Sequence, residues 1–326
     1  MAISGTTRKL GGFGLALAVA FAAAYGVGQA VGPVAAEPEP AAAEHEGMGG
    51  ADGAEDGMAD MGGHGDAHGG EPAGVPKGLM VSADGVTLDV LSDGLRAGVA
   101  TDFAFRILDD HGSPVTAFAP THDKLMHLVV ARRDLSGFQH VHPTMAADGT
   151  WRIPLTVASA GDYRVFADFL PRGREEGVTL GADVPVSGAY QPKPLPAPAL
   201  AADVDGYRVT LAGALVPGTT SKLTLSVDKG GVPVTDLQPY LAAYGHLIAL
   251  RQGDLAYLHV HPDGEPGDGK TPAGPSITFY AEVPTAGTYR LYLDFKHGGV
   301  VRTAELTAVA TPNESESHES EPHGEK

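Results

Sequence analysis

An internal repeat restricts the fold of this chain more than any other feature. The segment "PVTAFAPTHDKLMHLVVARRDLSGFQHVHP" aligns without a gap with "PVTDLQPYLAAYGHLIALRQGDLAYLHVHP". Further along, "WRIPLTVASAGDYRVFADF" matches "ITFYAEVPTAGTYRLYLDF". Each copy has about 110 residues, which is the size of one small domain. The sequence therefore predicts two similar domains in series.

The pattern inside each copy is typical of β-structure. Segments rich in Val, Thr and Tyr are separated by turn signals about every 8–12 residues, as in an all-β sandwich. Tyr163 and Tyr289 follow a Gly by two residues and begin strands with apolar–polar alternation, as a tyrosine corner does in an immunoglobulin-like domain. We expect two tandem immunoglobulin-like β-sandwiches and no helix of useful length beyond residue 34.

Composition shifts divide the chain into six expected parts, with the Pro-rich bridge "YQPKPLPAPA" between the two copies. The parts are a signal-anchor or signal peptide at 1–34, a disordered linker rich in His, Met and acidic residues at 35–77, the first β-sandwich at 78–188, the Pro-rich linker at 189–198, the second β-sandwich at 199–310, and a disordered acidic tail at 311–326.

The N-terminus predicts transport across a membrane. Arg8 and Lys9 precede an uncharged, mostly apolar or small stretch that reaches the ~20 residues needed to span a bilayer. The alternative is a signal peptide cleaved near Val34. Because the positive flank stays in the cytoplasm, both alternatives place the rest of the chain outside. We expect a single-pass membrane protein with extracytoplasmic C-terminal domains, or a secreted protein if the signal is cleaved.

Charge and composition exclude several classes of function. The formal charge of −18 makes nucleic acid or an anionic membrane surface an unfavourable partner. The chain has no cysteine, which excludes disulfides, thiolate metal sites and a cysteine nucleophile. No dinucleotide fingerprint or Gly-x-Ser-x-Gly motif is present, and no glutamate adjoins the histidine motif below as a general base. We therefore expect no enzymatic activity.

The same motif, His-x12-His-x-His-Pro, occurs in both copies. Residues i and i+2 of a strand point to one face, so His140 and His142 should lie side by side, as should His259 and His261. The first histidine of each set lies on the preceding strand, across a hairpin. If the register places the first histidine directly opposite one of the other two, the three imidazoles converge on one face of the sheet. A three-residue loop would instead send the first histidine to the other face. Arg132, Arg133 and Arg251, at the hairpins, are expected to be exposed.

Three converging neutral imidazoles suit Zn(II) or Cu(II), and the motif offers no sulfur ligand for Cu(I). The candidate ligands are His127, His140, His142, His246, His259 and His261, with Asp168, Asp294 and Met126 as further candidates. Weak sites in the linker would use His45, Met48, Met58, Met61, His64 and His68, although this segment can equally be a flexible acidic spacer. The unmatched His111, His122 and His297 are attributed to loop polarity or local contacts.

Several strings, among them "LVVARRDLSGFQHVHP" and "AGTYRLYLDFKHGGVVRTAEL", resemble a group of actinobacterial secreted or membrane-anchored tandem-repeat proteins with repeated His-x-His-Pro motifs. Members are usually uncharacterised or described as heavy-metal-binding. The resemblance implies the six motif histidines as ligands and metal binding without catalysis. The alternative is a cell-envelope interaction module in which the histidines are structural. No particular protein partner is indicated.

Overall fold

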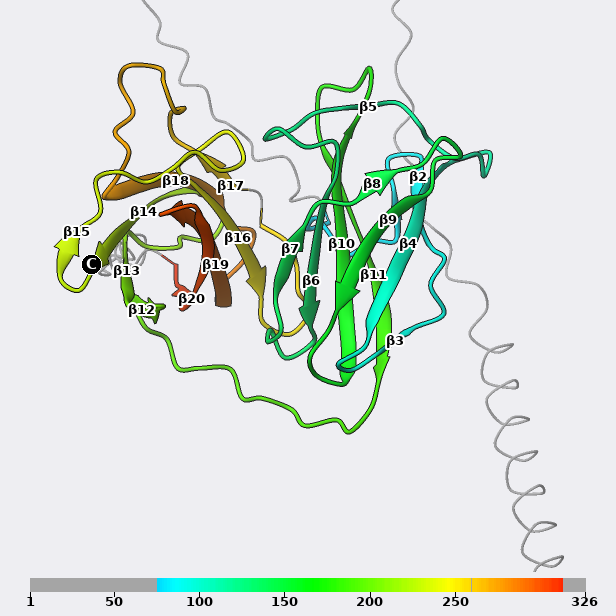
Figure 1. The fold of residues 1–326 in the computed structure, drawn as a ribbon, viewed down its shortest axis with the longest axis horizontal. Helices are drawn as coiled ribbons and strands as arrows, with labels where there is room; N and C mark the ends of the chain where they lie inside the picture. The colour runs from blue at the N-terminus through cyan, green and yellow to red at the C-terminus, as the bar shows by residue number, and fades with distance from the viewer. Residues whose placement is uncertain (1–74, 259, 313–326) are drawn as a thin grey trace, which may run out of the picture. The chain divides into compact units, whose positions relative to one another are not determined.

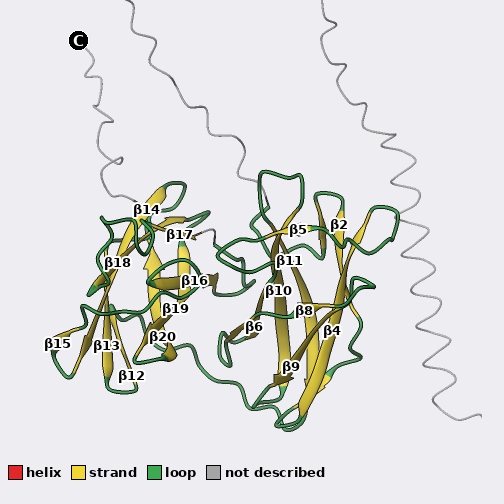
Figure 2. Ribbon diagram, turned by 45° about the horizontal axis from the view of Figure 1, so that its top comes forward, coloured by secondary structure: helices red, strands yellow, loops and turns green. Residues whose placement is uncertain are grey.

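The computed structural model describes residues 75–258 and 260–312, which form strands and loops without any helix (Figures 1 and 2). Within these ranges no helix is long and apolar enough to cross a membrane. The predicted anchor at 1–34, the tail from residue 313 and all candidate ligands of the linker lie outside the described residues. The all-β prediction is confirmed for the part of the chain that the structure describes.

The first sandwich has two sheets. One has the strand order β1-β2-β4-β9-β8, and the other has the order β3-β11-β10-β6-β7, with β5 paired to the end of β10. The strands are β1 (Ser82–Ala83), β2 (Val86–Val90), β3 (Leu95–Arg96), β4 (Ala100–Asp109), β5 (Phe118–Ala119), β6 (His127–Arg132), β7 (Gln139–Val141), β8 (Thr144–Met145), β9 (Trp151–Thr156), β10 (Gly161–Pro171) and β11 (Val178–Ser187). Aromatic side chains such as Phe103, Trp151 and Phe169 fill the core between the sheets.

The second sandwich repeats this plan with a smaller second sheet. Its sheets have the orders β12-β13-β14-β18-β17, with β15 on β14, and β16-β19-β20. The strands are β12 (Ala201–Val204), β13 (Tyr207–Ala212), β14 (Thr220–Lys229), β15 (Val232–Pro233), β16 (Gly245–Arg251), β17 (Val260–Pro262), β18 (Ser276–Glu282), β19 (Gly287–His297) and β20 (Val300–Ala310). Its own core contains Leu225, Phe279 and Phe295.

Both predicted tyrosine corners are present. The hydroxyl of Tyr163 donates to the carbonyl oxygen of Ser159 at 3.0 Å, and that of Tyr289 donates to the carbonyl oxygen of Thr285 at 2.8 Å. Each bond ties the start of a long central strand to the turn before it, as in immunoglobulin-like domains. The predicted fold of two tandem immunoglobulin-like sandwiches is thereby confirmed.

The two sandwiches also pack against each other. Strand β6 is buried on both faces, because Leu128 and Val130 point into the first core while Val129 and Ala131 belong to a third apolar cluster. We call this third cluster the inter-sandwich core. It consists of Val129, Ala131, Leu135, Phe166, Ile248, Leu250, Leu255, Tyr257 and Tyr292. The sheet containing β6 and β10 in the first sandwich therefore faces the sheet containing β16 and β19 in the second.

The contacts of the inter-sandwich core repeat with the two copies exchanged. The rings of Phe138 and Tyr292 stack with centroids 3.9 Å apart, and those of Phe166 and Tyr257 lie 5.6 Å apart. Phe138 and Tyr257 occupy equivalent positions of the repeat, as do Phe166 and Tyr292. The interface is therefore approximately two-fold symmetric. It resembles the interface of a homodimer in which both subunits use the same surface.

Each hairpin inserts a leucine into this interface, and the first hairpin has a buried ion pair behind it. Leu135 and Leu255 both adopt a left-handed backbone, with φ of 65° and 63°, and both are buried. The guanidinium of Arg132 is 1% exposed and lies 2.7 Å from the carboxylate of Asp134. The prediction that Arg132 is an exposed turn cation is wrong, because its side chain runs back under the hairpin and donates to the carbonyl of Ala160.

Backbone hydrogen bonds hold the segment before β1 in place. The backbone N–H of Tyr257 donates to the carbonyl of Lys77 at 2.9 Å, and Gly78 donates to the carbonyl of Thr179 at 3.0 Å. The segment before β1 therefore pairs with both sandwiches.

Candidate functional site

The register between β6 and β7 decides whether the first histidine motif can converge. Leu128 pairs with Val141 and Val129 pairs with His140, so the same register carries His127 towards His142. Since alternate residues of a strand share a face, all three histidines point to one side of the sheet. The predicted pairing of the first motif is confirmed, and this side is the one turned towards the second sandwich.

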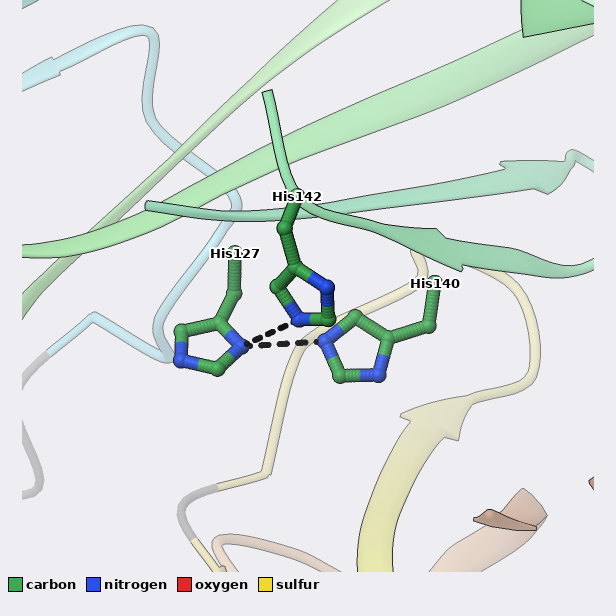
Figure 3. A group of neighbouring side chains, drawn as sticks. All are labelled: His127, His140 and His142. Carbon is green, nitrogen blue, oxygen red and sulfur yellow. Dashed lines mark hydrogen bonds between the residues drawn. The ribbon is translucent and has the colours of Figure 1, made fainter. Parts of the chain in front are cut away.

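One ring nitrogen of each of the three histidines points towards a common centre (Figure 3). The Nδ1 atom of His127 lies 3.1 Å from Nε2 of His140 and 3.2 Å from Nε2 of His142. Imidazole nitrogens bound to a tetrahedral metal ion at about 2.0–2.1 Å are separated from one another by about 3.3 Å. The observed separations are close to that value, and the three atoms all lie within 4.8 Å of one another.

Hydrogen bonds on the far side of two rings fix which nitrogen carries the proton. Nε2 of His127 lies 2.9 Å from the carbonyl oxygen of Thr121, an acceptor, so this nitrogen donates and Nδ1 keeps its lone pair. Nδ1 of His140 lies 2.9 Å from Oδ2 of Asp294, so His140 donates from Nδ1 and keeps its lone pair on Nε2. Two lone pairs therefore face each other at 3.1 Å, and only His142 is left to donate a proton between them.

The electrostatics of the cluster disfavour an extra proton. Burial lowers the pKa of His127 to about 4, with a further contribution from His140. Burial followed by His140 and His127 lowers the pKa of His142 to about 3. Both imidazoles are neutral near pH 7, and the neutral ring is the form that binds a metal ion.

The second sandwich contributes His246 to the same cluster. Its ring stacks on that of His127 with centroids 5.5 Å apart and an angle of 2° between the planes, and it lies 4.9 Å from that of His140. Burial and the neighbouring His140 lower the pKa of His246 well below its usual value. One group of histidines thus contains residues of both sandwiches, whereas the sequence predicted a separate set in each.

The second copy of the motif takes a different path. Val260 pairs with Ala281 of β18, whereas the equivalent Val141 pairs with Leu128 of β6. His261 is consequently exposed on β17 and pairs across the sheet with Tyr280, and His259 lies outside the described residues. The expectation of two equivalent sites is corrected accordingly, because β17 leaves the sheet of β16 for the opposite sheet.

The two candidate carboxylates lie beside the first histidine of each motif. Asp168 pairs with His127 between β10 and β6, and Asp294 pairs with His246 between β19 and β16. Thr179 donates to Asp168 at 3.0 Å, and burial raises the pKa of that carboxyl. Neither carboxylate belongs to the group of atoms that converges, and Asp294 instead accepts from His140.

The other candidates near the motif have local roles. Met126 is buried in the core of the first sandwich, on the side of the sheet away from the triad. His297 lies 2.7 Å from the hydroxyl of Tyr207 and 3.0 Å from Asp236, which confirms its local interpretation. His111 is exposed beside Asp110, as loop polarity predicts.

A cleft of about 490 Å³ opens beside the cluster. It is lined by residues of both sandwiches, among them His122, Asp168, His246, His261 and Glu282. The ring of His122 lies 5.3 Å from that of His246, and burial lowers its pKa. His122 is the histidine that sequence reasoning missed, because it has no counterpart in the second copy and its loop position gave no spacing signal.

Both sandwiches match one family model. The model is described as "Domain of unknown function (DUF8832)" and matches residues 81–186 and again residues 202–312. No curated protein matches the sequence significantly.

Several solved structures are remotely similar to this chain. The Escherichia coli adhesin FdeC is 16% identical with a TM-score of 0.23, and the match covers 70% of this chain and 64% of the adhesin. Invasin, a bacterial integrin-binding protein, is 15% identical with a TM-score of 0.21, covering 70% of this chain and 39% of invasin. Domains 4–9 of the surface layer protein SbsC are 12% identical with a TM-score of 0.20, covering 69% and 31%. Scores this low do not bear on function.

Proposed function

Because this chain belongs to the family described as a domain of unknown function (DUF8832), a description that assigns no activity, we propose its function from the site itself. We propose that the protein binds one Zn(II) or Cu(II) ion through His127, His140 and His142. It holds or hands on this ion outside the cytoplasm and performs no catalysis.

The convergence of three ring nitrogens is the observation that supports this proposal. His127 and His140 present lone pairs to each other, and their protons are already bonded to Thr121 and Asp294. Without a cation, two lone pairs at 3.1 Å repel each other unless His142 donates between them. Metal-binding histidines commonly donate their second nitrogen to a carbonyl or carboxylate, and two of the three rings here have that arrangement.

The donor set favours Zn(II) or Cu(II) over Cu(I). The described group has three imidazoles and no sulfur, and Met126, the one methionine next to the motif, packs into the apolar core. An open fourth position would leave room for water or for a ligand of a partner that exchanges the ion. The extracytoplasmic location rests on the N-terminal sequence, and the His- and Met-rich segments would serve as weak collecting sites.

Isothermal calorimetry on the full chain, purified without a histidine tag, tests the proposal. His142→Ala should weaken Zn(II) or Cu(II) binding at neutral pH by at least about 100-fold, because it removes one of three ligands. The matched variant His261→Ala changes the equivalent histidine of the second copy and should leave the tight site within about twofold. The terminal segments are unchanged in both variants, so their weak binding cancels in the comparison.

Equal binding by the wild type and His142→Ala would reject the metal site. That result would favour the second candidate function, an envelope module in which the histidines hold the sandwiches together. The bond from His140 to Asp294 joins the two sandwiches and is the observation that favours this candidate. It predicts that His140→Ala destabilises the chain equally with and without a chelator.

A further inference from the structure

Two aspartates occupy the same position in the two sandwiches and have different partners. Asp168 and Asp294 both precede a phenylalanine late in the long central strand, and each accepts from a threonine on the neighbouring strand. The threonines are Thr179 and Thr303, each directly opposite its aspartate in the register. Asp294 alone of this pair has a bond to a triad histidine, and that histidine belongs to the other sandwich.

From this difference we infer that Asp294 is a positioning residue of the metal site, through which the second sandwich sets the metal-binding form of His140. The inference rests on the proposed function. The side chains of His140 and Asp294 are 1% and 4% exposed, so water does not replace the bond between them. A site whose three ligands all belong to the first sandwich is therefore completed only when the second sandwich is docked.

The chemistry of a neutral imidazole explains why this contact matters. One ring nitrogen carries a proton and the other a lone pair, and only the lone pair binds a metal ion. Because Oδ2 of Asp294 accepts, it holds the proton of His140 on Nδ1 and leaves Nε2 free towards His127. An Asn at this position could present its NH₂ group instead, which would favour a proton on Nε2 and block the ligand atom.

Asp168 cannot play this role for the described triad. In the register it lies beside His127, but Nε2 of His127 is already bonded to the carbonyl oxygen of Thr121. Asp168 lines the cleft instead, near His122. The repeat therefore provides a matched control with the same residue type, a similar position in the sheet and the same kind of threonine partner.

Nitrogen NMR of the histidine rings tests the inference directly, without metal. In the chelator-treated full chain, the ¹⁵N shifts of His140 should report a proton on Nδ1. In Asp294→Asn they should shift towards the form protonated on Nε2, while in Asp168→Asn they should remain as in the wild type. An unchanged His140 tautomer in Asp294→Asn overturns the inference, whatever the metal affinity.

Metal titration provides the second readout. Zn(II) affinity should fall about 10–100-fold in Asp294→Asn, which is typical when the hydrogen-bond partner of a ligand is removed. It should change by less than about threefold in Asp168→Asn. With Co(II) as a spectroscopic probe, the visible spectrum at saturation should differ from the wild type in Asp294→Asn alone. Equal losses in both variants contradict the inference.

The two failures can be distinguished. If the wild type binds no metal but its His140 tautomer depends on Asp294, the positioning contact is real and the proposed function is wrong. If the wild type binds metal and Asp294→Asn binds equally well with an unchanged spectrum, the inference alone is wrong. Should Asp294→Asn fail to fold, Thr303→Val keeps the carboxylate but removes its other hydrogen bond. It should weaken binding several-fold, whereas Thr179→Val should not, and equal effects again reject the inference.

Discussion

The two copies of the His-Val-His-Pro strand have the same sequence and different surroundings. In the first sandwich Val141 pairs with β6, and His140 and His142 converge with His127. In the second, Val260 pairs with β18, and His261 is exposed. One difference in sequence accompanies this change. Leu258 is buried in the second core, whereas the equivalent Gln139 is half-buried and donates to the carbonyl of Thr156.

Duplication of the histidine motif has therefore not duplicated the converging group of histidines. Ligand geometry depends on which sheet a strand joins after the hairpin, and the hairpins of the two copies lead to different sheets. The second sandwich instead provides supporting groups, His246 and Asp294, to the triad of the first. An approximately symmetric interface therefore surrounds an asymmetric cluster.

Substitutions in the histidine cluster should change metal-induced stabilisation most, and they distinguish a proposed ligand from a neighbouring ring. His127→Ala removes a converging nitrogen and should abolish metal-induced stabilisation, which at a free metal concentration of 100 Kd is about 2.7 kcal/mol. His246→Ala removes only a stacked ring, so this variant should keep most of the metal-induced stabilisation. Thermal melts of both variants with Zn(II) and with chelator measure this. Equal loss in the two variants would mean that His246 is itself a ligand.

The next effect tests the symmetry of the inter-sandwich core. Leu135→Ala and Leu255→Ala each remove a buried side chain that the hairpin inserts into the interface. Each should lower the free energy of unfolding by about 2 kcal/mol, the low end for a buried leucine, because neighbours at an interface can partly close the gap. Urea unfolding measured with chelator gives both values. A cost in only one variant would contradict the two-fold symmetry of the interface.

A smaller effect concerns a bond that the second copy has and the first lacks. The hydroxyl of Tyr292 donates to the carbonyl of Leu135 at 2.6 Å, and the equivalent residue of the first copy is Phe166. Tyr292→Phe should cost about 1 kcal/mol, the usual net value of a hydrogen bond. Tyr280→Phe, at an exposed position, is the control and should cost less than about 0.5 kcal/mol. Indistinguishable urea midpoints for the two variants would show that the bond contributes nothing.

The first hairpin should also make the stability depend on pH. Burial acts to raise the pKa of Asp134, but hydrogen bonds from Arg132, Ser136 and the backbone of Lys193 outweigh it and lower the pKa to about 2. Because the pKa in the folded state lies below that in the unfolded chain, this stabilisation is complete above about pH 4 and is lost as the pH falls towards 2. Asp134→Asn should flatten the stability profile in that window. A profile parallel to that of the wild type would contradict this assignment.

Local sequence patterns predict the architecture and the grouping of His127, His140 and His142. The repeat, the strand alternation and the tyrosine corners gave two immunoglobulin-like sandwiches, since these signals depend on local periodicity and on turns. The spacing of His127, His140 and His142 predicted one converging group, because a hairpin brings nearby residues together whenever its register is right. The continuous apolar residues in "HLVVA" and "HLIAL" also indicate strands that are covered on both faces, as these two strands are.

The different surroundings of the two copies arise from tertiary packing. The docking of one sandwich on the other brings His246 beside His127 and Asp294 beside His140, over separations of more than a hundred residues along the chain. It also brings His122 into the same cleft as His246 and His261. Contacts of this kind depend on the shape and packing of two complete domains, and no spacing within either copy encodes them. The path of β17 belongs to the same category, because this strand pairs with β18 of the opposite sheet and follows Leu258, which packs into the second core.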